Sequence, residues 1–507
     1  MTDTIPRAVY NLIPLFVIIP LAGAFITSLV AKKVKWVADM LANLVSFVLL
    51  IASVASVLAV NTYGVLVYQV GIWKPPLGIS MVLDPLAAFM LLTVNLVVFL
   101  ITIYSINYME KYTAKWNFYT LFLLLVAGMN GVIITGDIFN LFVFLEIASV
   151  ASYALVAYGT DAEELEASFK YLVMSSVGSF FVLLGIALMY SYTSTLNMAD
   201  MAIVLAEKGL GRVTYFSAVL FLMGFGLKAA LVPFHAWLPD AHPAAPAPIS
   251  AMLSGVIIKA LGVYALIRIL YNVIGLPPVF SNVLMFLGAL SMIVGVFLAI
   301  GQFDLKRLLA YHSISQIGYV VLGIGLGTPL GILGGLFHLF NHSVFKSLLF
   351  LNAGAVEYAA GTRDLNSMGG LNKKMPVTGA TSLFASLAIA GIPPFNGFFS
   401  KLIIIFAAVE AGRMGYALLA VIASILTLAS FMKVQKFAFF GKLKESLSDI
   451  KEVPFFMKSA MISLALICLF GGLLLMPGIF GRFIKPAAET LHSGNAYSIT
   501  VMEGIEE

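Results

Sequence analysis

A small set of ionisable residues lies inside long apolar segments of this 507-residue chain. A charge at the depth of the hydrocarbon core costs at least about 2.5–3.5 kcal/mol, so such residues usually face a protein interior or a hydrated pathway and have a function there. Four lysines, two histidines and one glutamate have side chains that can take up and release protons in turn. We interpret them as a candidate proton relay: Glu146, Lys228, Lys259, His338, His342, Lys346 and Lys401.

The composition excludes a soluble globular protein. Hydrophobic residues make up 61% of the chain, charged residues make up 10%, and the mean hydropathy is +1.02, so water could not solvate the surface of such a fold. The net charge of +5 comes from loop residues and is therefore a signal of membrane topology, with no nucleic-acid partner. The only cysteine, Cys468, excludes disulfides and cysteine-held iron–sulfur clusters, so any redox cofactor would belong to another subunit.

Apolar segments of membrane-spanning length recur along the chain and predict an all-α polytopic membrane protein with about 14 transmembrane helices. The predicted spans are residues 11–31, 37–60, 85–108, 116–134, 138–158, 168–192, 213–233, 249–271, 279–301, 306–326, 329–356, 377–409, 415–438 and 456–477. Lys32, Lys33 and Lys35 end the first span, which distinguishes it from a signal peptide. Alternating apolar residues in 61–83 predict a short β-hairpin, and 197–212 is expected to form an interfacial helix or loop.

The seventh and twelfth predicted spans are each interrupted close to a lysine. Pro233 cannot donate a backbone hydrogen bond, so it breaks the seventh span near Lys228. In the twelfth span the sequence GIPPFNG at 391–397 ends one half-helix and begins another, with Asn396 as the expected N-cap. Irregular backbone at membrane depth needs protein or water around it, so Lys228 and Lys401 are both expected to border hydrated cavities.

The two breaks are five spans apart, and an odd offset places the broken helices in opposite directions across the membrane. This pattern predicts two inverted-topology five-helix repeats with broken helices 7 and 12. The expected division is an N-terminal unit of three spans with the hairpin, a first repeat, a second repeat, and a final unit with an inner loop, the last span and an external tail. Their bounds are residues 1–115, 116–272, 279–440 and 441–507.

The distribution of positive charge predicts the orientation. With the N-terminus outside, inward loops carry 17 of the 29 lysine and arginine residues, Lys306 among them, and outward segments carry 8, Arg268 among them. Cytoplasmic loops carry such an excess, so both termini are predicted to lie outside the cell membrane. Residues 486–507 are then expected to form a short, mobile external tail.

Four stretches closely resemble a known family. They are GDIFNLFVFLE at 136–146, PFHAWLPDAHPAAPAPISAMLSG at 233–255, HSISQIG at 312–318 and FHLFNHSVFK at 337–346. The chain resembles the antiporter-like membrane subunits shared by Mrp-type multisubunit Na+/H+ antiporters, respiratory complex I and membrane-bound NiFe hydrogenases. The resemblance covers predicted spans 3 to 13, and the first stretch is most similar to the D subunit of the Mrp antiporters.

The resemblance implies a role for each relay residue. Glu146 matches the glutamate that pairs with the lysine of the broken seventh helix, here Lys228, and Lys259 matches the connecting residue of the eighth. His338, His342 and Lys346 fall where the family has its connecting residues in the eleventh helix. Their spacing of i, i+4 and i+8 also places them on one helix face without family knowledge. Lys401 matches the exit residue of the twelfth helix, where some members carry glutamate.

Each assignment has a structural alternative. Glu146 and Lys228 could be a structural ion pair, and His338 and His342 could be polar residues satisfied across a helix interface. Lys346 could instead counter a loop carboxylate with its long side chain. A metal site at the two histidines lacks a third ligand, so no metal and no cofactor are expected.

Five further residues are candidates for proton uptake or for accessory roles. His312 lies nearer the inner end of its span and fits an uptake path. Asp137 precedes a span and is more simply an N-cap. His235, Asp240 and His242 lie in a proline-rich inward loop, where they either order the loop or line proton uptake.

Three classes of function remain. The first is an ion-translocating subunit without a catalytic centre of its own, working with other membrane subunits, including a second antiporter-like subunit and small subunits. The second is an enzyme subunit with a quinone site, which no cofactor motif supports, and the third is a membrane scaffold, which would not need polar residues at the breaks. The first is favoured, with protons and, as an alternative, Na+ as the transported ions. Na+/H+ exchange and pumping driven by a redox partner both remain open.

Overall fold

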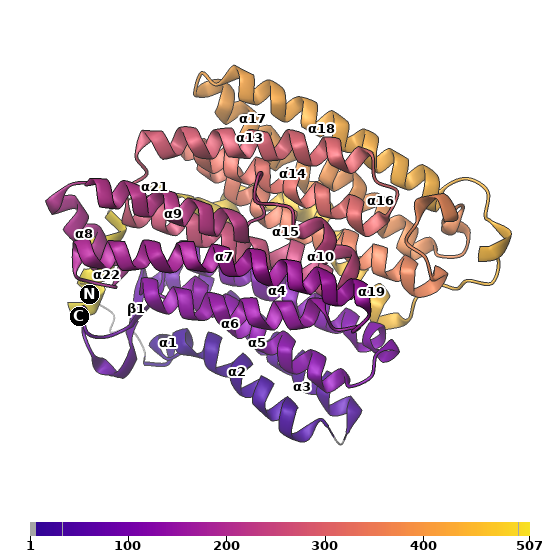
Figure 1. Ribbon diagram of the computed structural model, residues 1–507, viewed down its shortest axis with the longest axis horizontal. Helices are drawn as coiled ribbons and strands as arrows, with labels where there is room; N and C mark the ends of the chain where they lie inside the picture. Colours follow the sequence, from indigo (N-terminus) through magenta and orange to yellow (C-terminus); the bar gives the residue numbers. More distant parts are fainter. Residues whose placement is uncertain (1–6, 33, 495, 507) are drawn as a thin grey trace.

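Long apolar segments fold as helices in a membrane because a helix satisfies every backbone hydrogen bond within itself. The computed structural model describes residues 7–32, 34–494 and 496–506, in which long helices run side by side (Figure 1). Lys33, one of the three lysines predicted to end the first span, lies outside the described residues.

The first half of the chain contains the N-terminal helices, one hairpin and the first broken helix. Its elements are α1 (Arg7–Tyr10), α2 (Leu12–Val30), α3 (Lys35–Tyr63), β1 (Leu66–Gln69), η1 (Val70–Ile72), β2 (Ser80–Leu83), α4 (Pro85–Tyr108), η2 (Met109–Lys111), α5 (Lys115–Ile134), α6 (Ile138–Val156), α7 (Ala162–Thr193), α8 (Met198–Lys208), α9 (Arg212–Lys228), α10 (Leu238–Ala244), α11 (Ala247–Met252), η3 (Leu253–Tyr264), α12 (Ala265–Ile267) and η4 (Arg268–Val273). Strands β1 and β2 pair antiparallel, with Leu66 opposite Leu83, so the predicted hairpin is confirmed. Helix α8 confirms the predicted short helix in 197–212.

The second half contains the other broken helix and the C-terminal segment. Its elements are α13 (Pro278–Ile300), α14 (Leu305–Gly325), α15 (Pro329–Ala360), η5 (Leu365–Ser367), η6 (Leu371–Lys373), α16 (Pro376–Ala390), α17 (Asn396–Glu410), α18 (Met414–Val434), η7 (Gln435–Phe439), η8 (Glu445–Leu447), α19 (Phe455–Phe470), η9 (Gly471–Leu475), α20 (Pro477–Phe480), α21 (Ile484–His492) and α22 (Ala496–Glu506).

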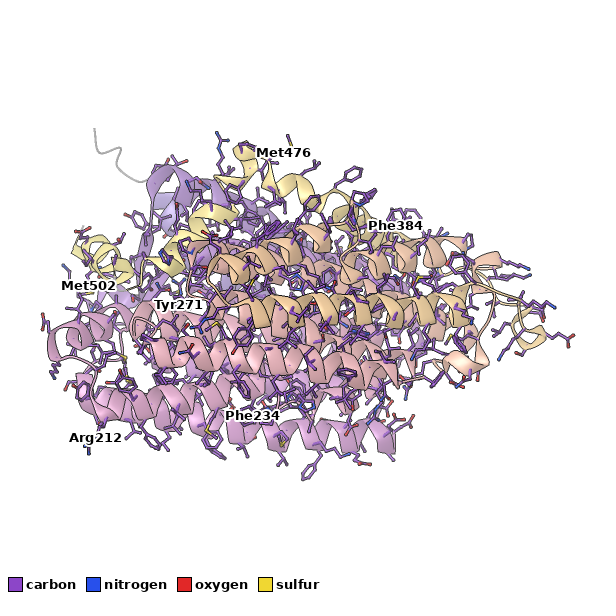
Figure 2. All side chains as sticks on the ribbon, turned by 90° about the horizontal axis from the view of Figure 1, so that it is seen from above. Arg212, Phe234, Tyr271, Phe384, Met476 and Met502 are labelled. Carbon is purple, nitrogen blue, oxygen red and sulfur yellow. The ribbon has the colours of Figure 1, made fainter. Side chains whose placement is uncertain are left out.

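In the described part of the chain, eleven helices are long and apolar enough to cross a membrane. The other three predicted spans correspond to α9, which has 17 residues, to the polar α15, and to α16 and α17, which have 15 residues each. The count of fourteen therefore stays a prediction. The first and last described helices, α1 and α22, both contact β1 and so lie at the same end of the bundle (Figure 1), and Arg212 and Met502 also share one end (Figure 2).

Both predicted breaks are present. Helix α9 ends at Lys228 and the chain stays irregular until α10 begins at Leu238. Helices α16 and α17 are separated by residues 391–395. The prediction that Asn396 caps α17 is wrong, because Phe395 holds the N-cap position and Asn396 is the first helical residue.

The two halves repeat the same packing order. Helix α5 packs against α6, and α7 packs against the broken α9; correspondingly, α13 packs against α14, and α15 packs against the broken pair α16 and α17. Helices α7 and α15 each have 32 residues. Helix α15 also contacts α11 and α19, so it lies inside the bundle and forms the core of the second half.

The segment 253–273 departs from an ordinary α-helix. Elements η3 and η4 are wide π-helical turns, which are rare and often mark functional sites. Arg268, expected in an outward segment, is instead buried in η4 and forms a two-pronged ion pair with Asp84 at 2.7 and 2.8 Å. Asp84 also caps α4 through the backbone N–H of Ala87. Hydropathy alone could not show that a distant carboxylate neutralises Arg268, and its assignment to the outward side stays a prediction.

The C-terminal tail was expected to be mobile, but its described residues form α21 and α22. Helix α22 packs against α8 and β1, and α21 packs against α15 and α4. The Tyr497 ring lies 5.0 Å from the Arg268 guanidinium, and Asn272 donates to the carbonyls of Thr490 and Gly494. These contacts attach the tail to η4.

Candidate functional site

Glu146 and Lys228 meet between α6 and the end of α9. The Lys228 Nζ lies 3.7 Å from the Glu146 carboxylate and donates to the hydroxyls of Ser149 at 2.9 Å and Ser175 at 2.5 Å. Ser179 in turn donates to Glu146. The Lys228 side chain is 2% exposed, whereas the Glu146 side chain is 33% exposed. The lysine is therefore enclosed by acceptors, and the glutamate reaches the side of the subunit.

Lys228 is the last residue of α9, which follows from the irregular backbone ahead of Pro233. The C-terminal end of a helix carries a partial negative charge and favours a cation. Removing one partner of a buried ion pair usually leaves the other charge at high cost. The sequence predicted this pair but not its three serines, although Ser149 lies three residues after Glu146 and Ser175 lies four residues before Ser179, as neighbours on one helix face do.

Lys259 and Lys346 form a second cluster, which has no carboxylate partner among the described residues. Lys259 in η3 donates to the carbonyl of Ser254, and Lys346 in α15 donates to the carbonyl of Leu309. Both side chains are fully buried, and the two ammonium groups lie close enough to interact electrostatically. Two like charges buried together without a carboxylate are unfavourable, so this cluster differs from the Glu146–Lys228 pair, in which the charges are opposite.

His338 and His342 continue along the same face of α15. Their rings lie 6.3 Å apart and are stacked, as the i, i+4 spacing predicts. His338 Nδ1 is 2.9 Å from the Ser400 hydroxyl, and its Nε2 is 3.2 Å from the side-chain oxygen of Gln316. Both ring nitrogens of His342 are buried without a hydrogen-bond partner in the described part of the chain, so they are free to hold water or a proton.

Lys401 lies in the second turn of α17, beside the break. Its Nζ donates to the carbonyl of Ile389 at 2.7 Å and lies 3.4 Å from the hydroxyl of Ser424. The same atom is 4.7 Å from the centre of the Tyr319 ring. Lys401 also lines a cavity of about 250 Å³ together with Gly391 and Ser424, so a cavity is present at this break, and its hydration stays a prediction.

The accessory candidates fall into two groups. Asp137 caps α6 by accepting from the backbone of Asn140 at 2.7 Å, which agrees with the structural alternative. Asp240 forms ion pairs with Lys170 at 3.2 Å and Arg307 at 3.4 Å, so it orders the loop that contains it. His235 is only half-buried, in the irregular segment before α10.

His242 and His312 instead point into the bundle. The His242 ring stacks on Phe350 at 4.4 Å, and neither of its nitrogens has a partner among the described residues. It lies within electrostatic range of Lys259, Lys346 and Lys306. His312 Nε2 is 2.8 Å from the Ser430 hydroxyl. Both histidines therefore lie near the second cluster and fit an uptake path toward it.

Lys306 was counted with the residues of the inward loops, but it lies buried in the first turn of α14. Its ammonium group is 2.7 Å from the Glu357 carboxylate and 3.2 Å from the carbonyl of Ala245. Arg363 extends this network to Asp304 and Glu163. The error has a simple cause, because Lys306 was placed by its distance from the apolar run, and a sequence does not show its carboxylate partner.

The residues predicted as one relay form two separate groups in this structure. Lys259, Lys346, His342, His338 and Lys401 form one group, which we call the row, and His342 lies within electrostatic range of the other four. No hydrogen bond links Lys228 to Lys259 in the described residues, although the elements that carry them touch closely. A Cβ on Gly262 would lie 2.5 Å from the backbone nitrogen of Ala229. Proton transfer between the two groups therefore needs water or a movement at this contact.

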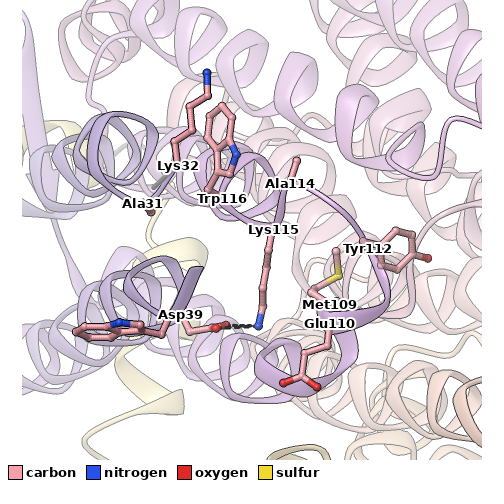
Figure 3. Close-up of a pocket in the computed structure, with 10 residues that line it drawn as sticks. Ala31, Lys32, Asp39, Met109, Glu110, Tyr112, Ala114, Lys115 and Trp116 are labelled. Carbon is pink, nitrogen blue, oxygen red and sulfur yellow. Dashed lines mark hydrogen bonds and ion pairs between the residues drawn. The ribbon is translucent and has the colours of Figure 1, made fainter. Parts of the chain in front are cut away.

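A larger cavity lies elsewhere. It has a volume of about 630 Å³ and is lined by Lys32, Asp39, Glu110, Lys115 and Trp116, where the ends of α2 and η2 meet the starts of α3 and α5 (Figure 3). The Asp39–Lys115 ion pair of 2.7 Å crosses it. None of the relay residues lines this cavity, so its size does not identify the site of transport.

Comparison with known proteins places this fold and site in one family. Residues 135–427 match the family described as NADH:quinone oxidoreductase/Mrp antiporter, TM, and residues 74–119 match the one described as NADH-Ubiquinone oxidoreductase (complex I), chain 5 N-terminus. The chain therefore belongs to the NADH:quinone oxidoreductase/Mrp antiporter family of membrane proteins.

Individual relatives come from both branches of that family. The D subunit of the Na(+)/H(+) antiporter of Alkalihalophilus pseudofirmus is 39% identical over 77% of this chain and 79% of the relative. The N subunit of the NADH-quinone oxidoreductase of Desulforudis audaxviator is also 39% identical, over 75% of this chain and 76% of the relative. A chain in the solved structure of the Mrp complex from Dietzia sp. superposes with a TM-score of 0.91 at 30% identity, over 98% of this chain and all of that one.

Proposed function

We propose that this chain translocates protons across the membrane as one subunit of a multisubunit complex. The observation that supports this most is the burial of five ionisable side chains near one another, with the stacked His342 and His338 and with Lys346 on one face of α15, and with Lys259 and Lys401 nearby. Burying ionisable groups at membrane depth costs free energy, so proteins usually keep such groups only where they have a function. The Glu146–Lys228 pair adds a second site. A charge that arrives or leaves nearby would change the attraction between the Glu146 carboxylate and the Lys228 ammonium group.

The proposed units divide the relay between the repeats. The first repeat, 116–272, carries Glu146, Lys228 and Lys259, and the second, 279–440, carries the other four residues. Both repeats are flanked by residues 1–115 and 441–507. A relay that crosses the boundary between two repeats can respond to movement of one repeat against the other, as alternating access requires.

The parent complex is proposed to be a cation/proton antiporter of the Mrp type. The alternative is a redox-driven complex of the hydrogenase or quinone oxidoreductase type. This alternative stays open because the chain is equally identical in sequence to an antiporter subunit and to a quinone oxidoreductase subunit. Neighbouring genes distinguish the two, because a redox-driven complex needs genes for a subunit with electron carriers.

Other membrane subunits are proposed as partners, including a second antiporter-like subunit. Glu146 is one-third exposed, and the cavity beside Lys401 is lined by Ile425, whose side chain is largely exposed. Both ends of the proposed relay thus come near the side of this subunit. A neighbouring membrane subunit could place charged groups against each of them.

A histidine substitution tests the proposed function. In the complex reconstituted in liposomes, His342→Leu is expected to lower proton translocation about 100-fold, because a buried group that titrates near neutral pH is lost from the row. Fluorescence of a pH-sensitive dye inside the liposomes measures the rate. His492→Leu, at an exposed position in α21, is the matched control and should transport at the wild-type rate. Undiminished transport by His342→Leu would remove this residue from the proposal.

We further propose a location in the cell membrane with both termini outside. Ser446→Cys in the inner loop is expected to react with a membrane-impermeant maleimide only from the cytoplasmic side, and Ser493→Cys only from the external side. Both positions are exposed, and Cys468 is buried and so does not interfere. Labelling in the reverse pattern would show that the lysine and arginine excess marks the external face.

A further inference from the structure

Tyr319 lies against two relay groups at once. It projects from α14 and is fully buried. Its ring centre is 5.4 Å from the centre of the His338 ring and 4.7 Å from the Lys401 Nζ. The residue was not singled out by its sequence, because an aromatic residue in an apolar helix is usually a packing residue.

His338 and Lys401 share no hydrogen-bond partner among the described residues. His338 bonds with Ser400 and Gln316, whereas Lys401 bonds with the carbonyl of Ile389 and with Ser424. Ser400 and Lys401 are consecutive in a helix, so their side chains diverge by about 100°. A proton moves only between groups in hydrogen-bond reach or joined by water, so transfer from His338 to Lys401, like the other steps along the row, needs water between the two groups.

The hydroxyl of Tyr319 does not join the two groups. It donates to the carbonyl of Ala420 in α18 and lies near the Ser424 hydroxyl, on the Lys401 side. His338 therefore contacts carbon atoms of the ring. The bond to Ala420 also holds the ring in place, because a buried hydroxyl that leaves its acceptor loses free energy.

We propose that Tyr319 is a barrier between the row of buried histidines and Lys401, and that the charge on Lys401 controls it. This inference rests on the proposed function. A protonated Lys401 attracts the ring face, and a cation–π contact of ordinary strength favours the closed position by about tenfold. A neutral Lys401 loses this attraction, so the ring is freer to move and water can join His338 to the lysine. Tyr319 thus lets a proton pass from His338 when Lys401 is neutral, and it hinders the return of the proton to His338 when Lys401 is protonated.

Removal of the ring tests the barrier. Tyr319→Ala would leave a space bordered by the polar groups of His338, Lys401 and Ser424, which can hold water there. In liposomes that contain the whole complex, without a driving substrate or ion gradient, we expect proton leak under a K+ diffusion potential to rise about tenfold, because water then joins His338 and Lys401 continuously. Tyr319→Phe keeps the ring and loses only the hydroxyl contact. Its proton leak should therefore be less than about three times that of wild type.

Two further variants decide the interpretation. Tyr271→Ala is the matched control, because Tyr271 is another buried tyrosine whose hydroxyl donates to a helix carbonyl, that of Ile324, without a relay group against its ring. It should leave the leak unchanged. Adding His338→Leu to Tyr319→Ala should abolish the added leak, because the proton then has no donor on the far side of the barrier.

The proposal is contradicted if the assembled Tyr319→Ala complex leaks no more protons than wild type. It is also contradicted if the added leak remains in the Tyr319→Ala, His338→Leu double variant. Assembly is checked by size-exclusion chromatography of the complex, and Tyr319→Leu, which keeps most of the volume, replaces Tyr319→Ala if assembly fails. Failure of the proposed function would look different, because the complex with His342→Leu would then translocate protons at the wild-type rate. The two failures are therefore distinguishable.

Discussion

Lys228→Ala is expected to lower coupled proton translocation by about 100-fold or more, because it removes the exchangeable proton of the first cluster. The complex should still assemble. Alanine leaves Ser149 and Ser175 with water or each other as partners, and the partly exposed Glu146 can remain hydrated. Initial rates of pH change in vesicles, normalised to the amount of complex, measure the effect.

Glu146→Gln should have a smaller effect than Lys228→Ala. The glutamine removes the charge that favours the ammonium, but two serine hydroxyls still accept from Lys228. Lys485→Ala, at an exposed lysine of α21, is the control for loss of a positive charge and should transport normally. Lys228→Ala vesicles that transport at the wild-type rate would contradict a relay role for this lysine.

Lys401→Arg is expected to block translocation as completely as Lys401→Ala does. Arginine keeps the positive charge and nearly the length of lysine, but it does not deprotonate in proteins. The adjoining cavity of about 250 Å³ offers room for the guanidinium, so a block would not be explained by crowding. Proton translocation by the two variants, measured in the same vesicles, separates fixed charge from proton transfer.

The opposite outcome for Lys401 has a clear meaning. If Lys401→Arg transports normally and Lys401→Ala does not, the residue supplies only a fixed charge at the break. Its role as a proton carrier would then be withdrawn, and so would the control of Tyr319 by its charge. The rest of the row, from Lys259 to His338, would not be affected by that result.

Much of this architecture could be predicted from the chain itself. Long apolar runs, Pro233 and the glycine and proline residues of 391–397 locate the helices and their two breaks, because hydropathy and backbone chemistry act locally. The i, i+4 and i+8 spacing of the α15 residues likewise places three relay candidates on one face.

Contacts between distant segments could not be predicted in this way. The ion pairs of Arg268 with Asp84 and of Lys306 with Glu357 could not be seen, because each carboxylate partner is far away in sequence. The π-helical turns of η3 depend on close packing against α9 and α15, which no local pattern reports. Tyr319 resembles any other aromatic core residue until its two neighbours are seen. The interruption between Lys228 and Lys259 is also invisible in a sequence, because residue type does not reveal hydrogen-bond continuity.

The ion pair of Asp84 and Arg268 also has a consequence for biosynthesis. The two residues are 184 positions apart, and chains are synthesised at about 5–20 residues per second. Asp84 therefore leaves the ribosome about 10–40 s before its partner, a delay that follows from the same rate of synthesis. During that time the nascent chain carries an unneutralised carboxylate at a helix start, and the first helices cannot reach their final packing. A chain truncated before Arg268 would keep this defect permanently, which distinguishes it from a complete one for membrane quality control.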